Sequence, residues 1–181
     1  MRLFAGFKLS KESLATIKQV LKPDVKISWV HPDNLHLTAR FFGETAPEKL
    51  PKLVEALRAV CQSHTAFDIR TMGVGAFPNT RRAHIFWLGI KEDSGALQSL
   101  AIDLENMAVS LGFKPEKRAY FPHLTIGRDR HGHTADAVLT SYKNKDFGLS
   151  HLDRLVLFES VSDAKGAHYQ ILEEFPLKIV D

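Results

Sequence analysis

The sequence predicts an α+β fold with largely antiparallel strands. Two long stretches have apolar residues at helical spacing, and seven or eight shorter stretches alternate between apolar and polar residues as strands do. Several of these strands follow one another across short turns, which favours hairpins over long crossovers. A break near Ser94 separates two similar sets of strands and helices, so we expect two lobes within a single domain of residues 1–181.

The N-terminal part of the chain predicts three strands and two helices. One helix follows the first strand, and the other follows the third. Ser10 is a suitable helix cap, and Pro47 fits the first turn of the second helix. The expected elements are a strand over 2–9, a helix from Ser10 to Leu21, strands over 25–30 and 35–42, and a helix that begins at Thr45 or Ala46.

The rest of the chain predicts two hairpins with helices between them. Gly112 follows the long helix at the position where left-handed geometry favours glycine. The expected elements are a hairpin of 67–77 and 83–90, a helix over 94–111, a short strand over 124–128, a polar loop over 129–134, a short helix over 135–142, and a closing hairpin of 152–160 and 168–177.

Composition limits the class of protein without naming a function. The chain has 181 residues, of which 44% are hydrophobic, and no apolar run approaches the roughly 18 residues of a membrane span. We therefore expect no membrane association. The single cysteine, Cys61, cannot form an internal disulfide, which favours a cytoplasmic location. A formal net charge of +3 is compatible with a polyanionic partner but not diagnostic of one.

Two short segments carry a possible chemistry. His36-Leu37-Thr38 and His123-Leu124-Thr125 both lie in apolar runs that predict strands. Residues two apart on a strand share a face, so each segment should present an imidazole beside a hydroxyl, with the leucine on the opposite face. Each segment follows a residue that favours turns.

This pairing suits the transfer of a phosphoryl group. A neutral imidazole can take a proton from water, and a protonated one can donate a proton to a leaving oxygen. Threonine hydroxyls can donate hydrogen bonds to phosphate oxygens. In-line displacement puts the attacking and leaving oxygens on opposite sides of phosphorus, so one histidine on each side suffices and no metal or other cofactor is required.

Chance matches must be weighed against this interpretation. With nine histidines in the chain, about one His-x-Ser/Thr match is expected by accident. Two partly buried structural histidines are therefore the alternative, and the sequence context rather than the match itself favours catalysis.

The chain resembles the 2H phosphoesterase superfamily, whose signature is a pair of His-x-Thr motifs. It is more closely similar to the RNA 2′,3′-cyclic phosphodiesterases, also called 2′-5′ RNA ligases. The resemblance covers nearly the whole chain. The matching segments are residues 2–5, 29–38, 41–43, 77–78, 86–89 and 121–128. Ala39 departs from the family pattern, which has a larger aliphatic residue there.

The resemblance implies a bilobal fold of two mainly antiparallel sheets, flanked by helices, with one motif on each wall of a central groove. It also implies metal-independent hydrolysis of RNA 2′,3′-cyclic phosphate ends to 2′-phosphomonoesters. His36 would donate a proton to the leaving 3′ oxygen, and His123 would activate water. Reversal with a 5′-hydroxyl would give ATP-independent 2′-5′ ligation. We expect a monomer.

Further residues are candidates for contacts with the substrate. Thr38, Thr125 and Arg128 are candidate phosphate-binding residues, although strict alternation would turn Arg128 away from Thr125. Candidate RNA contacts are Arg40, which regular alternation puts on the Thr38 face, Arg81 in the predicted hairpin turn, and the aromatic Phe121.

Other histidines suggest no metal site. His131 and His133 lie close to Asp129 and Asp136, but on a predicted polar loop without a second ligand cluster. Two functional alternatives remain. One is a cyclic phosphodiesterase for a small nucleotide of the ADP-ribose cyclic phosphate type. The other is a non-catalytic RNA-binding module.

Overall fold

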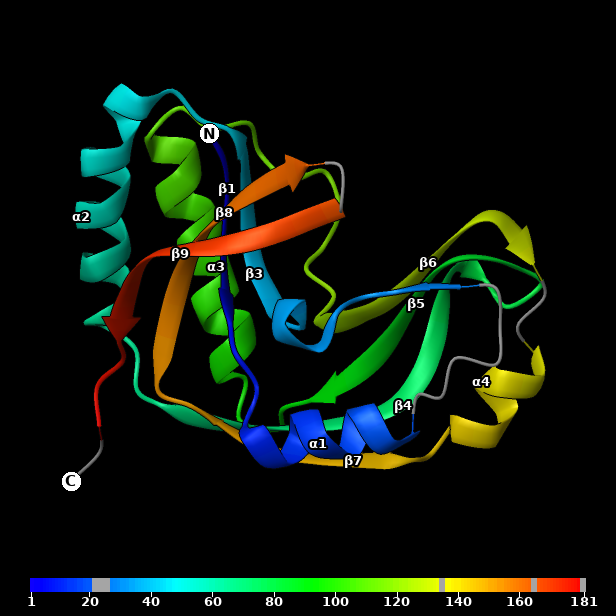
Figure 1. The fold of residues 1–181 in the computed structure, drawn as a ribbon. Coiled ribbons are helices and arrows are strands. Elements are labelled where there is room, and N and C mark those ends of the chain that lie inside the picture. Colours follow the sequence, from blue (N-terminus) through cyan, green and yellow to red (C-terminus); the bar gives the residue numbers. More distant parts are fainter. Residues whose placement is uncertain (21–26, 134–135, 164–165, 180–181) are drawn as a thin grey trace.

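The computed structural model describes residues 1–20, 27–133, 136–163 and 166–179, and within these ranges it contains four α-helices and nine strands (Figure 1). The helices are α1 (Lys11–Val20), α2 (Leu50–Cys61), α3 (Ala96–Ser110) and α4 (Asp136–Tyr142). The strands are β1 (Arg2–Phe7), β2 (Ser28–Trp29), β3 (Leu37–Glu44), β4 (Phe67–Asn79), β5 (Arg82–Lys91), β6 (His123–His133), β7 (Asp146–Leu152), β8 (Arg154–Asp163) and β9 (Gly166–Pro176).

The strands form two antiparallel sheets. Sheet A has the order β3-β1-β8-β9, and sheet B has the order β2-β6-β5-β4-β7. This confirms the predicted α+β fold class with two mainly antiparallel sheets and flanking helices. Sheet A, however, combines strands from both ends of the chain. The two lobes therefore do not correspond to the two halves that the break near Ser94 suggested.

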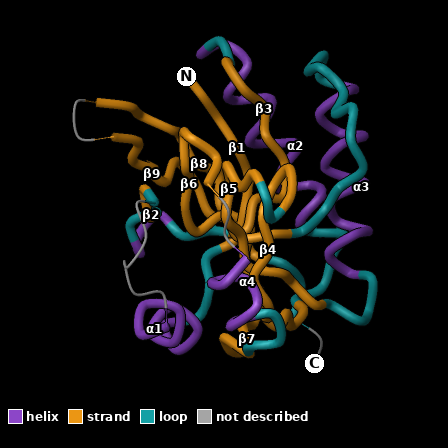
Figure 2. Tube along the Cα trace, turned by 90° about the vertical axis from the view of Figure 1, so that its right-hand side faces the viewer, coloured by secondary structure: helices purple, strands orange, loops and turns teal. Residues whose placement is uncertain are grey.

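The helices are divided between the sheets. Helices α2 and α3 pack against each other and contact β9 and β3 of sheet A, whereas α1 contacts β7 and α4 contacts β4 of sheet B. Figure 2 shows α2 and α3 on one side of the strands and α1 on the other. Among the described residues, no helix combines the length and the apolar character that crossing a membrane requires.

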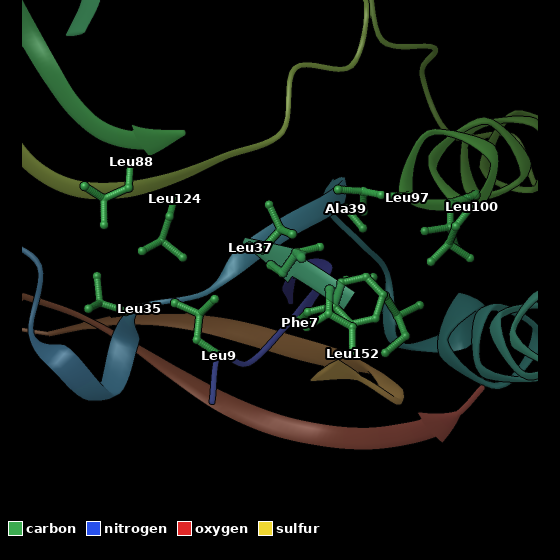
Figure 3. Close-up of a cluster of buried hydrophobic side chains, with 14 of the residues drawn as sticks. Phe7, Leu9, Leu35, Leu37, Ala39, Leu88, Leu97, Leu100, Leu124 and Leu152 are labelled. Carbon is green, nitrogen blue, oxygen red and sulfur yellow. The ribbon is translucent and has the colours of Figure 1, made fainter. Parts of the chain in front are cut away.

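One apolar core connects the two sheets. Leu37 of β3 and Leu124 of β6 are both 0% exposed and belong to the same cluster of buried side chains (Figure 3). Leu35 and Leu88 lie in this cluster as well. The leucine in the middle of each His-x-Thr segment therefore anchors its strand in a shared core, which fixes the two segments relative to each other.

Most predicted elements are present, with three differences. The polar loop expected over 129–134 is wrong, because β6 continues to His133. Strand β7 was not predicted. Only Ser28–Trp29 of the strand expected over 25–30 is a strand in the described residues, since 21–26 lie outside them, as do 164–165 in the closing hairpin.

Candidate active site

The two motif histidines occupy corresponding positions. His36 immediately precedes β3, and His123 is the first residue of β6. Because Leu37 and Leu124 point into the core, the flanking histidine and threonine of each motif lie on the opposite face of their strand. Strands β3 and β6 contact each other although they belong to different sheets. The two motifs therefore approach each other at the junction of the sheets.

Both imidazoles make the same type of hydrogen bond, from Nδ1 to the backbone carbonyl two residues earlier. The Nδ1 of His36 lies 2.7 Å from the carbonyl oxygen of Asn34, and the Nδ1 of His123 lies 2.8 Å from that of Phe121. A carbonyl oxygen can only accept, so Nδ1 must donate in each case. In the neutral ring, Nε2 then has the lone pair. Each histidine is thus fixed in the tautomer whose Nε2 can take up or release a proton.

Aromatic side chains support each ring. The His36 ring lies 4.6 Å from the Phe4 ring and meets Tyr169 edge-on at 4.9 Å, with Phe158 behind them. These aromatic residues come from β1, β8 and β9, and Phe4 and Phe158 form a second small apolar cluster. The orientation of His36 is therefore determined by packing as well as by its hydrogen bond.

The support of His123 comes from sheet B and the segment before β6. Phe77 of β4 meets the His123 ring edge-on at 5.3 Å, and Phe121 lies 6.0 Å away. Trp87 of β5 contacts both phenylalanines. The two histidines therefore have similar aromatic surroundings made from unrelated parts of the sequence.

The charge state of His36 depends on this environment. Burial lowers the pKa of His36 below its ordinary value of 6.5, because the charged imidazolium loses its hydration. The hydrogen bond to the Asn34 carbonyl acts in the opposite direction, and the nearby charges of Arg128 and His123 lower the pKa further. Both residues of sheet B thus lie within electrostatic range of His36.

Arg128 lies on the same face of β6 as Thr125 because β6 contains a bulge. Across the β5–β6 pair, Trp87 is opposite Thr125 and Ile85 is opposite Arg128, so Ile126 is an extra residue on β6. Trp87 and Ile85 are two apart and share a face, and their partners therefore share it too. This explains how Arg128, three residues beyond Thr125, can act on His36.

A matching bulge in β3 has the reverse effect on Arg40. Thr38 is opposite Gly6, and Arg40 is opposite the neighbouring Ala5, so the two side chains lie on different faces and the expectation of a shared face is wrong. Phe41, opposite Phe4, returns to the face of Thr38.

Arg40 is engaged in a network within the protein. It is 5% exposed and forms ion pairs with Glu105 of α3 at 2.5 Å and Glu116 at 3.4 Å. It also donates a hydrogen bond of 2.8 Å to the Lys114 carbonyl. These contacts tie β3 to α3 and to the α3–β6 connection (residues 111–122). The guanidinium of Arg40 is therefore occupied by groups of the protein itself, and we assign it no contact with RNA.

Tyr120 provides a second tie between the motifs. Its partly buried phenol donates a hydrogen bond of 3.0 Å to the Thr38 carbonyl, and loss of hydration raises its pKa well above 10. The next residue, Phe121, supplies the carbonyl that holds His123. The α3–β6 connection therefore links the backbone of the first motif to the imidazole of the second.

A cavity of about 910 Å³ opens beside His123. Thr38 of the first motif and His123 of the second both line it, with Phe41, Phe77 and Phe121. Phe41 and Phe121 are each about half exposed, at 51% and 50%. Exposed aromatic faces next to a polar site are suited to stacking a base or holding a ribose.

The remaining predicted residues lie in several places. Thr125 is half-buried on β6, and Arg81 is exposed between β4 and β5. His131 is exposed, and its amide donates a hydrogen bond to the Asp129 side chain. The side chains of His133 and Asp136 lie outside the described part of the chain. In that part, no group of three or more His, Cys, Asp or Glu side chains is placed to hold a metal ion.

Sequence reasoning missed the aromatic residues that support His36, and it missed Tyr120. Phe4 could have been found from alternation on β1, since it is a large apolar residue on the face opposite Leu3 and Ala5. Tyr169 and Tyr120 have no local signal, because their contacts to His36 and Thr38 span 133 and 82 residues.

Each sheet contributes one His-x-Thr motif, and the two motifs lie at the junction of the sheets. Together they form a two-histidine site. The chain belongs to the 2′-5′ RNA ligase superfamily, whose family model matches residues 10–164. It is 34% identical to the RNA 2′,3′-cyclic phosphodiesterase of Archaeoglobus fulgidus, over 97% of this chain and 99% of that protein. It is 30% identical to the enzyme of the same name from Aquifex aeolicus, over 98% and 97% of the two chains.

The fold is also similar to that of a solved structure. The crystal structure of E. coli LigT in its apo form matches with a TM-score of 0.80 and 26% identity, covering 97% of this chain and 96% of that one. The fold and the family predicted from the sequence are both confirmed.

Proposed function

We propose that this chain is an RNA 2′,3′-cyclic phosphodiesterase that hydrolyses cyclic phosphate ends to 2′-phosphomonoesters. The observation that carries the proposal is the pair of imidazoles from different sheets, each held through Nδ1 to a backbone carbonyl so that Nε2 is available. The names of the two curated relatives support the substrate class. They favour it over a small cyclic nucleotide and over a non-catalytic RNA-binding module.

In the proposed reaction, a water oxygen attacks phosphorus as the bond to the 3′ oxygen breaks. His123 takes the proton of the water, and His36 gives a proton to the leaving 3′ oxygen. The phosphate remains on the 2′ oxygen. The assignment of the two roles follows the family resemblance. With a 5′-hydroxyl in place of water, the same site forms a 2′-5′ linkage, and in the reverse direction the histidines exchange roles.

Three further side chains would stabilise the charge on phosphorus. The hydroxyls of Thr38 and Thr125 donate hydrogen bonds to the non-bridging oxygens, and the guanidinium of Arg128 neutralises their negative charge. The effect of Arg128 on the pKa of His36 supports its position beside the reacting group. The aromatic ring of Phe121 is placed to contact the nucleoside.

We also propose that the protein is a cytoplasmic monomer with a single domain. Both motifs belong to one chain, so a monomer is sufficient for the reaction. The core shared by both sheets supports a single domain over 1–181. Cys61 is a buried free thiol, and burial raises its pKa to about 12, which is compatible with the reducing conditions of the cytoplasm.

Product analysis tests the proposed function. The purified protein, incubated in EDTA with an oligonucleotide that ends in a 2′,3′-cyclic phosphate, should convert it to the 2′-phosphate. The two phosphomonoester isomers separate by chromatography and can be assigned by ³¹P NMR. A 3′-phosphate product would contradict the proposed direction of bond cleavage, and loss of turnover in EDTA would contradict metal independence.

A further inference from the structure

The outer end of sheet B is strongly basic. Residues 79–84, at the β4–β5 turn, and 127–131, on β6, contain four arginines and one aspartate, a net charge of +3 that equals the formal charge of the whole chain. Arg81, Arg82, Arg128 and Arg130 are all exposed, whereas Asp129 is only 5% exposed. This end of the sheet therefore carries a cluster of exposed positive charge.

The two basic segments lie side by side. A side chain at Gly132 of β6 would come within 3.1 Å of the Arg82 side chain and 2.6 Å of the His84 ring. Figure 1 likewise shows the end of β6 next to the β4–β5 turn. Arg82 and the end of β6 thus form one surface.

This surface is continuous with the candidate active site. Arg128 acts on His36 and shares the groove face with Thr125. Arg130 is two residues further along β6, where the pairing with β5 is irregular. Asp129 between the two arginines is buried while both arginines are exposed, so Arg128 and Arg130 lie on the same, solvent-facing side of this segment. In the described part of the chain, Arg82, Arg128 and Arg130 form no ion pair with an acidic side chain. Their charges remain available to an anionic partner.

The other side of the cavity has mixed charge. The wall made by α3 and the α3–β6 connection includes Glu105 and Glu116, which pair with Arg40, and also Arg118. The exposed arginines at the outer end of sheet B differ in that no neighbouring carboxylate neutralises Arg82, Arg128 or Arg130 among the described residues, which favours a polyphosphate backbone there.

We propose that the RNA strand upstream of the cyclic phosphate leaves the groove over the outer end of sheet B, with Arg82 and Arg130 binding its backbone phosphates. This inference rests on the proposed function and identifies where the body of the RNA lies. A 2′,3′-cyclic phosphate is always at a 3′ end, so the rest of the strand must extend from the 5′ side of the terminal ribose. The basic surface, which we call the β6 track (Arg82, Arg130), is the path that the charges favour.

A comparison of two substrates distinguishes an effect on the β6 track from an effect on the reaction centre. The substrates are a ten-nucleotide RNA ending in a 2′,3′-cyclic phosphate and a 2′,3′-cyclic mononucleotide, which is too short to reach the track. The double variant Arg82→Gln/Arg130→Gln should lower kcat/KM for the oligonucleotide roughly tenfold at low salt, with less than a twofold change for the mononucleotide. The slope of log kcat/KM against log salt concentration should become shallower by about 1.4 for the oligonucleotide.

A matched control removes the same charge elsewhere. Lys52→Gln/Lys178→Gln changes two exposed lysines, on α2 and after β9, and should leave both substrates and the salt slope unchanged. Equal losses on both substrates, or an unchanged salt slope in the track variant, would overturn the proposal.

Binding provides a readout that does not depend on turnover. Fluorescence anisotropy with a labelled ten-nucleotide RNA bearing a 2′-phosphate should show about tenfold weaker binding to the track variant than to the wild type or the lysine control. If the wild type cleaves neither substrate, the proposed function fails, and the anisotropy result still decides the track. Equal affinity of all three proteins would refute it.

Discussion

Replacement of either His36 or His123 by alanine should lower kcat for hydrolysis of a cyclic-phosphate oligonucleotide by about 10²–10⁴-fold, with a much smaller change in KM. Each imidazole supplies proton transfer in the transition state, and general acid–base catalysis by one group has about this magnitude. The double variant should lose less than the product of the two single losses, because the groups act in one concerted displacement. Steady-state kinetics on purified variants measures all three.

His151 provides a matched control for these variants. It is exposed on β7 and pairs with Asp68 across sheet B, away from both motifs. His151→Ala should therefore keep wild-type kcat. Retention of hydrolysis by the His36→Ala/His123→Ala protein, with a native circular dichroism spectrum, would end the assignment of catalysis to this pair.

Replacement of Arg40 by alanine should lower the free energy of unfolding by about 3 kcal/mol, at the lower end of what loss of a buried ion-pair partner costs. The guanidinium lies between Glu105, Glu116 and the Lys114 carbonyl, and its removal leaves these groups without their cation. The partly exposed glutamates recover some hydration, which argues for the lower value. Urea denaturation monitored by tryptophan fluorescence gives the difference.

The exposed ion pair of Arg58 provides a control for the Arg40→Ala variant. Arg58 on α2 pairs with Glu173 of β9, and both side chains are substantially exposed. Arg58→Ala should cost less than about 1 kcal/mol. If Arg40→Ala were as mild as Arg58→Ala and instead weakened RNA binding selectively, the original expectation of an RNA contact at Arg40 would be restored.

The parts of the fold that the sequence predicts well are those where burial follows a regular period. Leu53 and Leu57 of α2 recur at helical spacing and are buried, and the Leu37 and Leu124 anchors follow strand alternation. Strand β7 shows the opposite case. Its Leu149 is 49% exposed while Ser150 is buried, where it accepts a hydrogen bond from the Ser10 amide. A sheet face held by serine hydrogen bonds has no apolar pattern to detect.

The site was predicted to the extent that it depends on the two motifs alone. Strict alternation gave the wrong face for Arg40 and left Arg128 uncertain, because a single extra residue in each strand reverses which residues face the groove. Such a bulge is set by pairing with a distant strand. The aromatic supports of His36 likewise depend on β9, which only the three-dimensional arrangement of sheet A brings to the motif.

Two distant segments of the chain meet at the junction of the sheets, and the pKa of His36 reports their proximity directly. A positive charge near an imidazole disfavours the protonated form, so removal of the Arg128 charge should raise the pKa. In an NMR pH titration, His36 of the wild type should titrate below 6.5. The value should rise in Arg128→Gln and stay constant in Lys52→Gln. If His36 has its ordinary pKa and this pKa does not change in Arg128→Gln, the two segments do not share a site.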